Sequence, residues 1–265
     1  MFGSFIGSPG SSQSDFGEKM LNTVASQSIR RLFSDCEAVE VDIRCFPSSK
    51  LLQGSVDSFK MLGKGLVIRR QFRVEQMAFE TDAIAIDFGS VLKGQIRLKQ
   101  PTQAIAQVTL SEDGINEAFS ADLVRKRLND VSLTLDSALG IDTPVSFRDI
   151  SIKLLASNQI EIHAKVDIPG RDAVPVSVRT SLAVERRRRL LFTNAEFQAD
   201  LIPEEARALS APLTAAFVEI LNNMVDLDRF DLDGVEMRIN RVEIQPQKLL
   251  FSGYAQINHF PGGMS

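Results

Sequence analysis

The chain has 265 residues, of which 44% are hydrophobic and 24% charged, and its net charge is -4 at pH 7. This composition is typical of a folded globular protein and excludes the disordered, collagen-like and disulfide-rich classes. A negative net charge argues against a surface built as a whole for nucleic acid, so any basic binding site has to be local. The sequence holds neither the roughly 18 uninterrupted apolar residues of a membrane span nor the basic start of a secretory signal. We therefore expect a cytoplasmic protein.

No linker rich in glycine or proline separates two halves of the chain. The sequence therefore predicts a single elongated domain over residues 15–260. It predicts a flexible N-terminal arm over residues 1–14 and a flexible tail over residues 261–265, because both segments are short and rich in glycine or serine.

The first half of the chain reads as two helices and several strands. Apolar residues on one helical face predict a helix over 16–33. Ser111 as N-cap, acidic residues behind it and a basic end predict a second helix over 112–128. Strand-like runs lie at 39–45, 56–62, 65–70, 72–80, 83–88, 94–98 and 104–110.

The second half is dominated by four long alternating runs, at 145–155, 159–168, 174–185 and 190–200. Their short connections favour hairpins and hence an antiparallel meander. Two further alternating runs, at 234–245 and 249–260, close the chain. The sequence therefore predicts an α+β fold rather than an α/β fold.

A third helix is predicted over 203–225, and Pro212 should kink or break it near Ser210 and Ala211. Its residues Glu219, Asn222 and Asn223 lie on one side of the helical wheel. The opposite, apolar face carries Leu209, Leu213, Ala216, Phe217, Ile220, Leu221 and Met224.

Residues for acid, base or nucleophilic chemistry are few, since the chain has two histidines, one tyrosine and no tryptophan. His163 is expected at a solvated strand position and His259 in a frayed tail. No metal-ligand spacing is present, and the glycines at 63 and 65 read as a hairpin turn rather than a phosphate loop. We expect no catalytic residue, no metal and no cofactor.

Two features stand out from this background. Aromatic residues are almost all phenylalanine, with 17 Phe against one Tyr, and such rings suit an apolar interior. Arg186, Arg187, Arg188 and Arg189 form a predicted turn between two strands. This turn is either a solvated hairpin or a contact for anionic groups, above all phosphate headgroups. The interpretation that the turn binds RNA is less favoured than either of these, because no aromatic residues lie among the arginines to stack on bases.

The run CEAVEVDIRCFPSSKLLQGSVDSFKMLGKGLVI at 36–68 and the run PTQAIAQVTLSEDGINEAF at 101–119 carry a family resemblance. Together they resemble the LmeA-like phospholipid-binding family, most of all its cyanobacterial and plastid branch. The resemblance extends over about residues 15–260, which is nearly everything but the arm.

The resemblance implies a fold related to the tubular lipid-binding (BPI/SMP-like) superfamily. That fold is a long, strongly curved antiparallel sheet wrapped around a long kinked helix, with an apolar groove for acyl chains. It implies a non-enzymatic protein that binds or transfers a phospholipid or glycolipid, with the apolar face of the third helix lining the groove. The four arginines would then contact anionic headgroups or a membrane peripherally. Exported members of the family carry a signal that is not seen here.

Two other readings stay open at this stage. The first is a structural or interaction module with a fully packed core and no ligand, and the second is a small-molecule enzyme. A lipid-binding groove and a filled core both require apolar residues on the inward faces. The sequence therefore does not distinguish a lipid-binding protein from a packed module. The identity of the lipid, the direction of transport and the oligomeric state are also open.

Overall fold

The structure is a computed structural model that describes residues 16–47, 49–93, 95, 97–133, 143–224 and 234–259. The predicted arm at 1–14 and the predicted tail at 261–265 lie outside these residues. The single domain over 15–260 stays a prediction.

The strands are β1 (Ala38–Arg44), β2 (Ser55–Val56), β3 (Ser58–Ile68), β4 (Phe72–Thr81), β5 (Ile84–Ala85), β6 (Thr102–Ser111), β7 (Ser146–Leu155), β8 (Gln159–Asp167), β9 (Val174–Glu185), β10 (Arg189–Phe197), β11 (Val235–Gln245) and β12 (Lys248–Ile257). The helices are α1 (Phe16–Arg30), α2 (Ser49–Leu52), α3 (Phe88–Val91), α4 (Glu112–Phe119), α5 (Asp122–Leu128) and α6 (Arg207–Met224), with short 3-10 turns η2 (Ala199–Leu201) and η3 (Glu204–Ala206) before α6.

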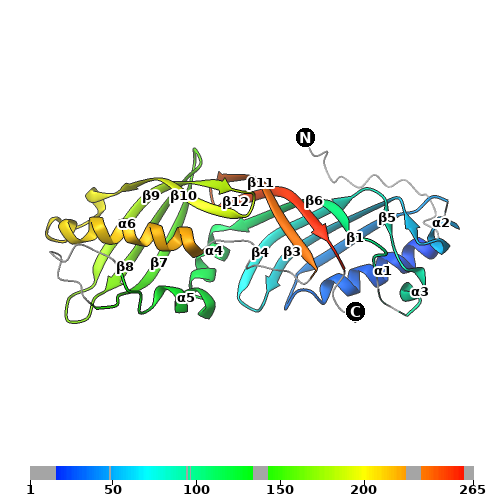
Figure 1. Ribbon diagram of the computed structural model, residues 1–265, viewed down its shortest axis with the longest axis horizontal. Coiled ribbons are helices and arrows are strands. Elements are labelled where there is room, and N and C mark those ends of the chain that lie inside the picture. Colours follow the sequence, from blue (N-terminus) through cyan, green and yellow to red (C-terminus); the bar gives the residue numbers. More distant parts are fainter. Residues whose placement is uncertain are drawn as a thin grey trace.

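Two main antiparallel sheets follow one another along an elongated molecule (Figure 1), and β2 and β5 form a further sheet of two strands. The first has six strands in the order β1-β3-β4-β6-β12-β11, and the second has four in the order β10-β9-β8-β7. The α+β class and the antiparallel meander of the second half are confirmed. The single strongly curved sheet around one long helix is not what the structure shows. The apolar faces of the strands are divided between two sheets, and each sheet has a helix of its own.

Each sheet buries one face against that helix, because alternating strands offer one apolar face each. In the six-stranded half, α1 packs on the sheet through its buried residues Leu21, Ala25 and Ile29. In the four-stranded half, α6 packs on the sheet with α4 and α5 beside it. Strands β11 and β12 have buried residues in both cores, so they join the halves.

Two local predictions were wrong in detail. The glycines at 63 and 65 do not form a hairpin turn, since β3 runs through them as one strand. Gly65 has φ +56, and a Cβ there would lie 2.3 Å from the Glu37 side chain, so the glycine allows a close approach within the strand. The predicted helix over 112–128 is two helices, because Ala121 has an extended backbone between α4 and α5.

Of the two outcomes predicted at Pro212, a kink or a break, the break does not occur, because α6 runs unbroken through this residue. Proline removes the hydrogen bond to the carbonyl four residues earlier, which here belongs to Ala208. Ala208 is exposed, so we infer that water can satisfy this carbonyl and the helix continues. A bend at this position stays a prediction.

Asparagine side chains cover three of the four edges of the two main sheets. Asn22 of α1 accepts a hydrogen bond from the N–H of Ile43 on edge strand β1, at 2.9 Å. Asn116 of α4 bonds both backbone groups of Ile152 on edge strand β7, at 2.7 and 3.0 Å. Asn222 of α6 covers β10 in the same way. These side chains satisfy strand groups that would otherwise be open to pairing with another chain.

The fourth edge, β11, is covered by hairpin tips of the other sheet. The N–H of Ile239 donates to the carbonyl of Arg187 in the β9–β10 turn, at 2.8 Å. The N–H of Ile244 donates to Oδ1 of Asn158 in the β7–β8 turn, at 3.1 Å. The two sheets are therefore joined by hydrogen bonds to the backbone of β11 as well as by apolar contacts.

Replacing Asn116 by alanine is expected to lower the free energy of unfolding by about 1–3 kcal/mol. The change leaves the N–H and the carbonyl of the buried residue Ile152 without partners, and unpaired buried groups cost about this much. Urea denaturation measures the loss. The matched control is Asn129→Ala at the exposed end of α5, which should change the stability by less than about 0.5 kcal/mol.

Candidate functional site

The apolar face predicted for the third helix lies against the four-stranded sheet. Leu213, Phe217 and Leu221 are each at most 1% exposed and belong to the core of this half. Three other predicted members, Leu209, Ile220 and Met224, are partly exposed and pack against the same core. Ala216 is half-buried and is not among the residues of this core. The structure thus brings six of the seven predicted residues to the core under α6.

Phe217 is the centre of this contact. Its ring stacks on the ring of Phe147 of β7, with the ring centroids 4.7 Å apart and the planes 13° from parallel. An offset stack of this kind adds to the free energy of burying two apolar rings. The helix is therefore held on the sheet mainly by hydrophobic contact at its middle.

Polar contacts hold α6 near its two ends. The Ser210 hydroxyl donates to the carbonyl of Pro175 on β9, at 2.6 Å. Near the other end, the N–H of Phe192 on β10 donates to Oδ1 of Asn222, at 2.6 Å. On the helical wheel Asn222 lies opposite the apolar face, yet in the structure it is half-buried and bonded to the sheet.

Thr214 lies in the middle of the helix and is not among the residues that the sequence predicts for this site. It is 3% exposed, and within the described part of the chain its hydroxyl has no hydrogen-bond partner. A buried hydroxyl without a partner costs about 1–3 kcal/mol, so such groups are rare. The only signal in the sequence is its position, one turn before the buried Val218.

The four-arginine turn lies at the tip of the β9–β10 hairpin and is largely engaged with the protein itself. The Arg187 guanidinium donates to Oδ1 of Asn240 on β11. The Arg189 guanidinium pairs with Glu185 at 3.2 Å and donates to the carbonyl of Asn222 of α6 at 3.1 Å. Arg188 is half-buried. Arg186 is exposed, at φ 48.

These contacts put the arginine turn beside the last turn of α6. The predicted apolar face and the predicted basic group are therefore neighbours at one place in the fold. The turn is therefore more than a solvated hairpin. Its residues Arg187 and Arg189 connect the β9–β10 hairpin to β11 and to α6.

His163 is half-buried rather than fully solvated. Its Nδ1 lies 3.0 Å from the hydroxyl oxygen of Ser177, which is 1% exposed. Ser151, His163 and Ser177 are aligned across β7, β8 and β9 by the strand register. This polar row lies on the face of the sheet turned away from α6. His259 is exposed and lies against Gly234, where a Cβ would be 2.5 Å from its carbonyl oxygen.

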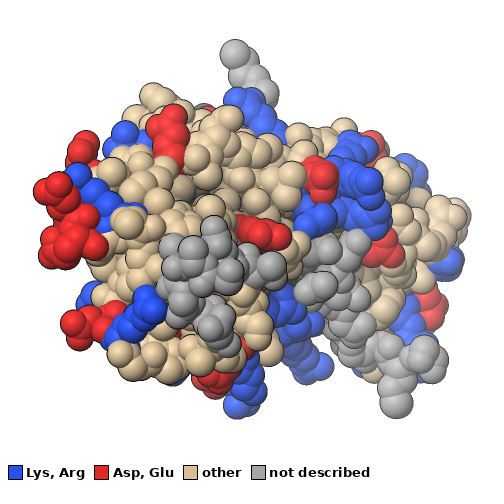
Figure 2. Space-filling view, turned by 60° about the vertical axis from the view of Figure 1, so that its left-hand side comes forward, with Lys and Arg blue, Asp and Glu red and all other residues tan. Residues whose placement is uncertain are grey.

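Acidic and basic side chains are interspersed on the four-stranded half, around wide areas without charge (Figure 2). On the exposed side of the meander, Lys165 lies 3.0 Å from Asp149 and Arg148 lies 2.5 Å from Asp167. The hydrogen bond from Lys165 holds the pKa of Asp149 below its ordinary value, and Arg148 adds to the effect. These exposed pairs are screened by water and contribute little to stability.

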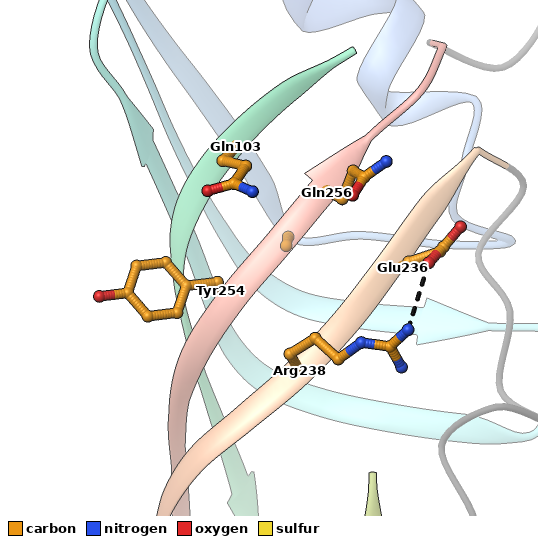
Figure 3. A pocket seen from close by; sticks show the side chains of 6 residues that line it. Gln103, Glu236, Arg238, Tyr254 and Gln256 are labelled. Atoms are coloured by element: carbon orange, nitrogen blue, oxygen red, sulfur yellow. Dashed lines mark hydrogen bonds and ion pairs between the residues drawn. The ribbon is translucent and has the colours of Figure 1, made fainter. Parts of the chain in front are cut away.

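A shallow hollow lies on the outer face of the six-stranded sheet (Figure 3). Its volume is about 80 Å³, and side chains of β6, β11 and β12 line it, among them Tyr254 and an ion pair of Arg238 with Glu236 at 3.4 Å. Small-molecule sites measure about 300–1,000 Å³. This hollow is too small to be one.

The fold and these contacts define an α+β protein in which the helix α6 packs with an apolar face on a four-stranded antiparallel sheet. The chain belongs to the LmeA-like phospholipid-binding family, whose pattern it matches over residues 13–253. This range includes all of α6 and the four-stranded sheet. Searches among curated proteins and among solved structures found no match. None of the helices in the described ranges is both long enough and apolar enough to cross a membrane.

Proposed function

We propose that this protein binds a phospholipid without chemical conversion and holds its acyl chains between α6 and the four-stranded sheet. Membership of a phospholipid-binding family is the observation that carries the proposal. Transfer of the lipid between membranes, relation to the cyanobacterial branch and relation to the tubular lipid-binding superfamily are parts of the same proposal.

The chemistry of the α6 interface supports acyl-chain binding. Between Ser210 and Asn222, which tie the helix to the sheet, the buried surface is apolar except for Thr214. Burial of a methylene group contributes about 0.8 kcal/mol of favourable free energy. An acyl chain can therefore replace the apolar contacts between α6 and the sheet with apolar contacts of its own. Opening the interface between its two polar ties would admit the chain.

Thr214 gives this interface a polar group for the lipid. A hydroxyl that is buried without a partner can donate to the ester carbonyl of a phospholipid that enters beside it. The ester groups lie between acyl chains and headgroup, so the headgroup would then lie within reach of an end of α6. The arginine turn beside the last turn of the helix offers guanidinium groups for its phosphate.

The proposal is tested first by organic extraction of the purified protein followed by mass spectrometry. We expect a phospholipid in the extract. A second experiment adds phospholipid vesicles to delipidated protein, removes the vesicles, and extracts again. Absence of lipid from both extracts would overturn the proposal and favour a packed module.

Replacing Ala216 by tryptophan is expected to reduce the extracted lipid per protein severalfold. Ala216 is half-buried and lies one helical turn from both Leu213 and Ile220, so the added ring would occupy space that the acyl chain needs. The control is Ala215→Trp, one residue along the same helix but exposed, which should leave the lipid content unchanged. Equal lipid content in the two variants would contradict a site under α6.

Replacing Thr214 by valine is expected to raise the free energy of unfolding of the delipidated protein by about 1 kcal/mol and to lower its lipid content. The first effect follows from removal of an unpaired buried hydroxyl and the second from loss of the donor. Thermal melting and extraction measure the two. Thr214→Ser keeps a hydroxyl, so it should retain lipid. If valine and serine bind lipid equally, Thr214 is not a lipid contact.

A further inference from the structure

Large apolar side chains protrude from one end of the molecule, far along its long axis from α6. Among the exposed large hydrophobic residues of the described chain, the three most exposed are Phe46 at 84%, Leu52 at 69% and Leu92 at 65%. They lie on the segments 44–57 and 82–100, which carry α2 and α3 and close the six-stranded half (Figure 1). We call these two segments the α2–α3 end.

The protruding residues belong to ordered turns whose neighbours point inward. In α2, Leu51 is buried, and Leu52 next to it is exposed. At α3, Val91 is buried, and Leu92 next to it is exposed. Leu51 and Val91 therefore supply the core contacts of these two helices. The exposed residues Leu52 and Leu92 are not part of the core.

A carboxylate fixes the backbone of Phe46. Its N–H donates to the carboxylate of Asp57 at 2.7 Å, and Lys50 lies 2.8 Å from the same carboxylate. Lys50 and the Phe46 N–H hold the pKa of Asp57 below its ordinary value, so this carboxylate stays charged at neutral pH.

Hydrogen bonds join the two segments to one another. The N–H of Ile86 donates to the carbonyl of Gly54 at 2.7 Å, and the Lys99 ammonium donates to the carbonyl of Gln53 at 2.9 Å. The exposed apolar residues of both segments are thus fixed relative to one another.

The charge of the α2–α3 end differs in sign from that of the chain. Its two segments contain five basic residues and three acidic residues; with Asp42, which pairs with Arg44 at 3.1 Å just outside them, the net charge is +1, whereas the whole chain carries -4. The basic residues are Arg44, Lys50, Lys93, Arg97 and Lys99, and the acidic ones are Asp57, Asp82 and Asp87. Separate apolar side chains among lysines and arginines fit the interface of an anionic bilayer, where the apolar groups enter and the basic groups meet lipid phosphates.

We infer that the protein docks on anionic membranes through its α2–α3 end, with Phe46, Leu52 and Leu92 entering the interfacial layer. The inference does not depend on the lipid site under α6, which lies in the other half. It gives the molecule a fixed orientation, in which α6 is held away from the bilayer surface.

The first test is vesicle sedimentation of the full chain with phosphatidylcholine vesicles, with and without phosphatidylserine. The triple variant Phe46→Ser, Leu52→Ser, Leu92→Ser should lose at least tenfold in partitioning to the anionic vesicles. The control replaces three apolar residues that are exposed elsewhere, Ile105→Ser, Leu123→Ser and Leu201→Ser, and should bind like the wild type. Thermal melting of both variants shows whether each is folded.

The second test works even if the triple variant fails to fold. The chain has no tryptophan, so Phe46→Trp places a single reporter at the α2–α3 end, and Leu123→Trp places one in α5. The emission of the reporter at 46 should shift to the blue on addition of anionic vesicles and return at high salt, while the reporter at 123 should not respond.

Several results would overturn the inference. They are equal binding of neutral and anionic vesicles, equal loss in the two triple variants, no shift from the reporter at 46, and concentration-dependent self-association through this end in place of vesicle binding. Lipid extraction of the same variants keeps the two proposals apart. Loss of vesicle binding with retained lipid concerns only the α2–α3 end, and loss of lipid with retained vesicle binding concerns only the α6 site.

Discussion

Replacing Phe217 by alanine is expected to lower the free energy of unfolding by about 3–5 kcal/mol in delipidated protein. Phe217 is fully buried and stacks on Phe147, so its removal leaves a cavity between α6 and the sheet, and losses of this size follow such truncations. Chemical denaturation measures the loss. In lipid-loaded protein the acyl chain should fill part of the cavity, so the loss should be smaller.

The matched control is Leu123→Ala in α5, where the side chain is 51% exposed. It should cost well under 1 kcal/mol with or without lipid. A loss at Phe217 that is the same in delipidated and lipid-loaded protein would contradict an acyl chain beside this ring.

Replacing Gly54 by alanine is expected to destabilise the protein by about 3 kcal/mol. Gly54 has φ +78, a backbone conformation that costs a side chain about 1–2 kcal/mol. A Cβ would also lie 2.1 Å from the carbonyl oxygen of Ile86, and overpacking of this kind costs about 1–3 kcal/mol. Thermal and chemical unfolding measure the sum.

Gly170 separates the two effects. It has the same φ of +78, but no atom of the described residues lies within 4 Å of the position that a Cβ would take. Gly170→Ala should therefore cost only the backbone part, about 1–2 kcal/mol. Equal losses at 54 and 170 would show that the contact between Gly54 and Ile86 is looser than the structure has it.

Local features of the fold could be predicted from the sequence because they depend on neighbours in the chain. Ser111 was predicted as an N-cap, and its hydroxyl accepts from the N–H of Gly114 at 3.1 Å. The four alternating runs of the second half became a meander because short turns join them. The α+β class follows from the same periodicities.

The division into two sheets could not be predicted in this way. Strand β12 pairs with β6 from Lys248 opposite Ser111 to Ile257 opposite Thr102. Periodicity shows which residues of a strand face the core, but it does not show which distant strand lies beside it. The same holds for Asn222, since a polar residue that bonds a neighbouring sheet has the same pattern as one that faces water.

Of the candidate site, the sequence predicted the apolar face of α6 and the presence of the arginine turn. It did not predict Thr214, because an isolated threonine in an apolar helix carries no sign of being unpaired. Nor did it predict that Arg187 and Arg189 hold β11 and α6, because these partners are distant in the chain.

The covering of β11 by two hairpin tips has a consequence for the order in which the chain becomes stable during synthesis. The strands β1, β3, β4 and β6 leave the ribosome before the meander, and β6 then has an open edge until β12 is synthesised. The four-stranded meander and α6 are synthesised between β6 and β11, and the tips of the meander lack their partner until β11 follows. Contacts so distant in sequence form slowly. The growing chain is therefore most open to misassembly before the β11–β12 hairpin is made, and removal of this hairpin would destabilise both halves together.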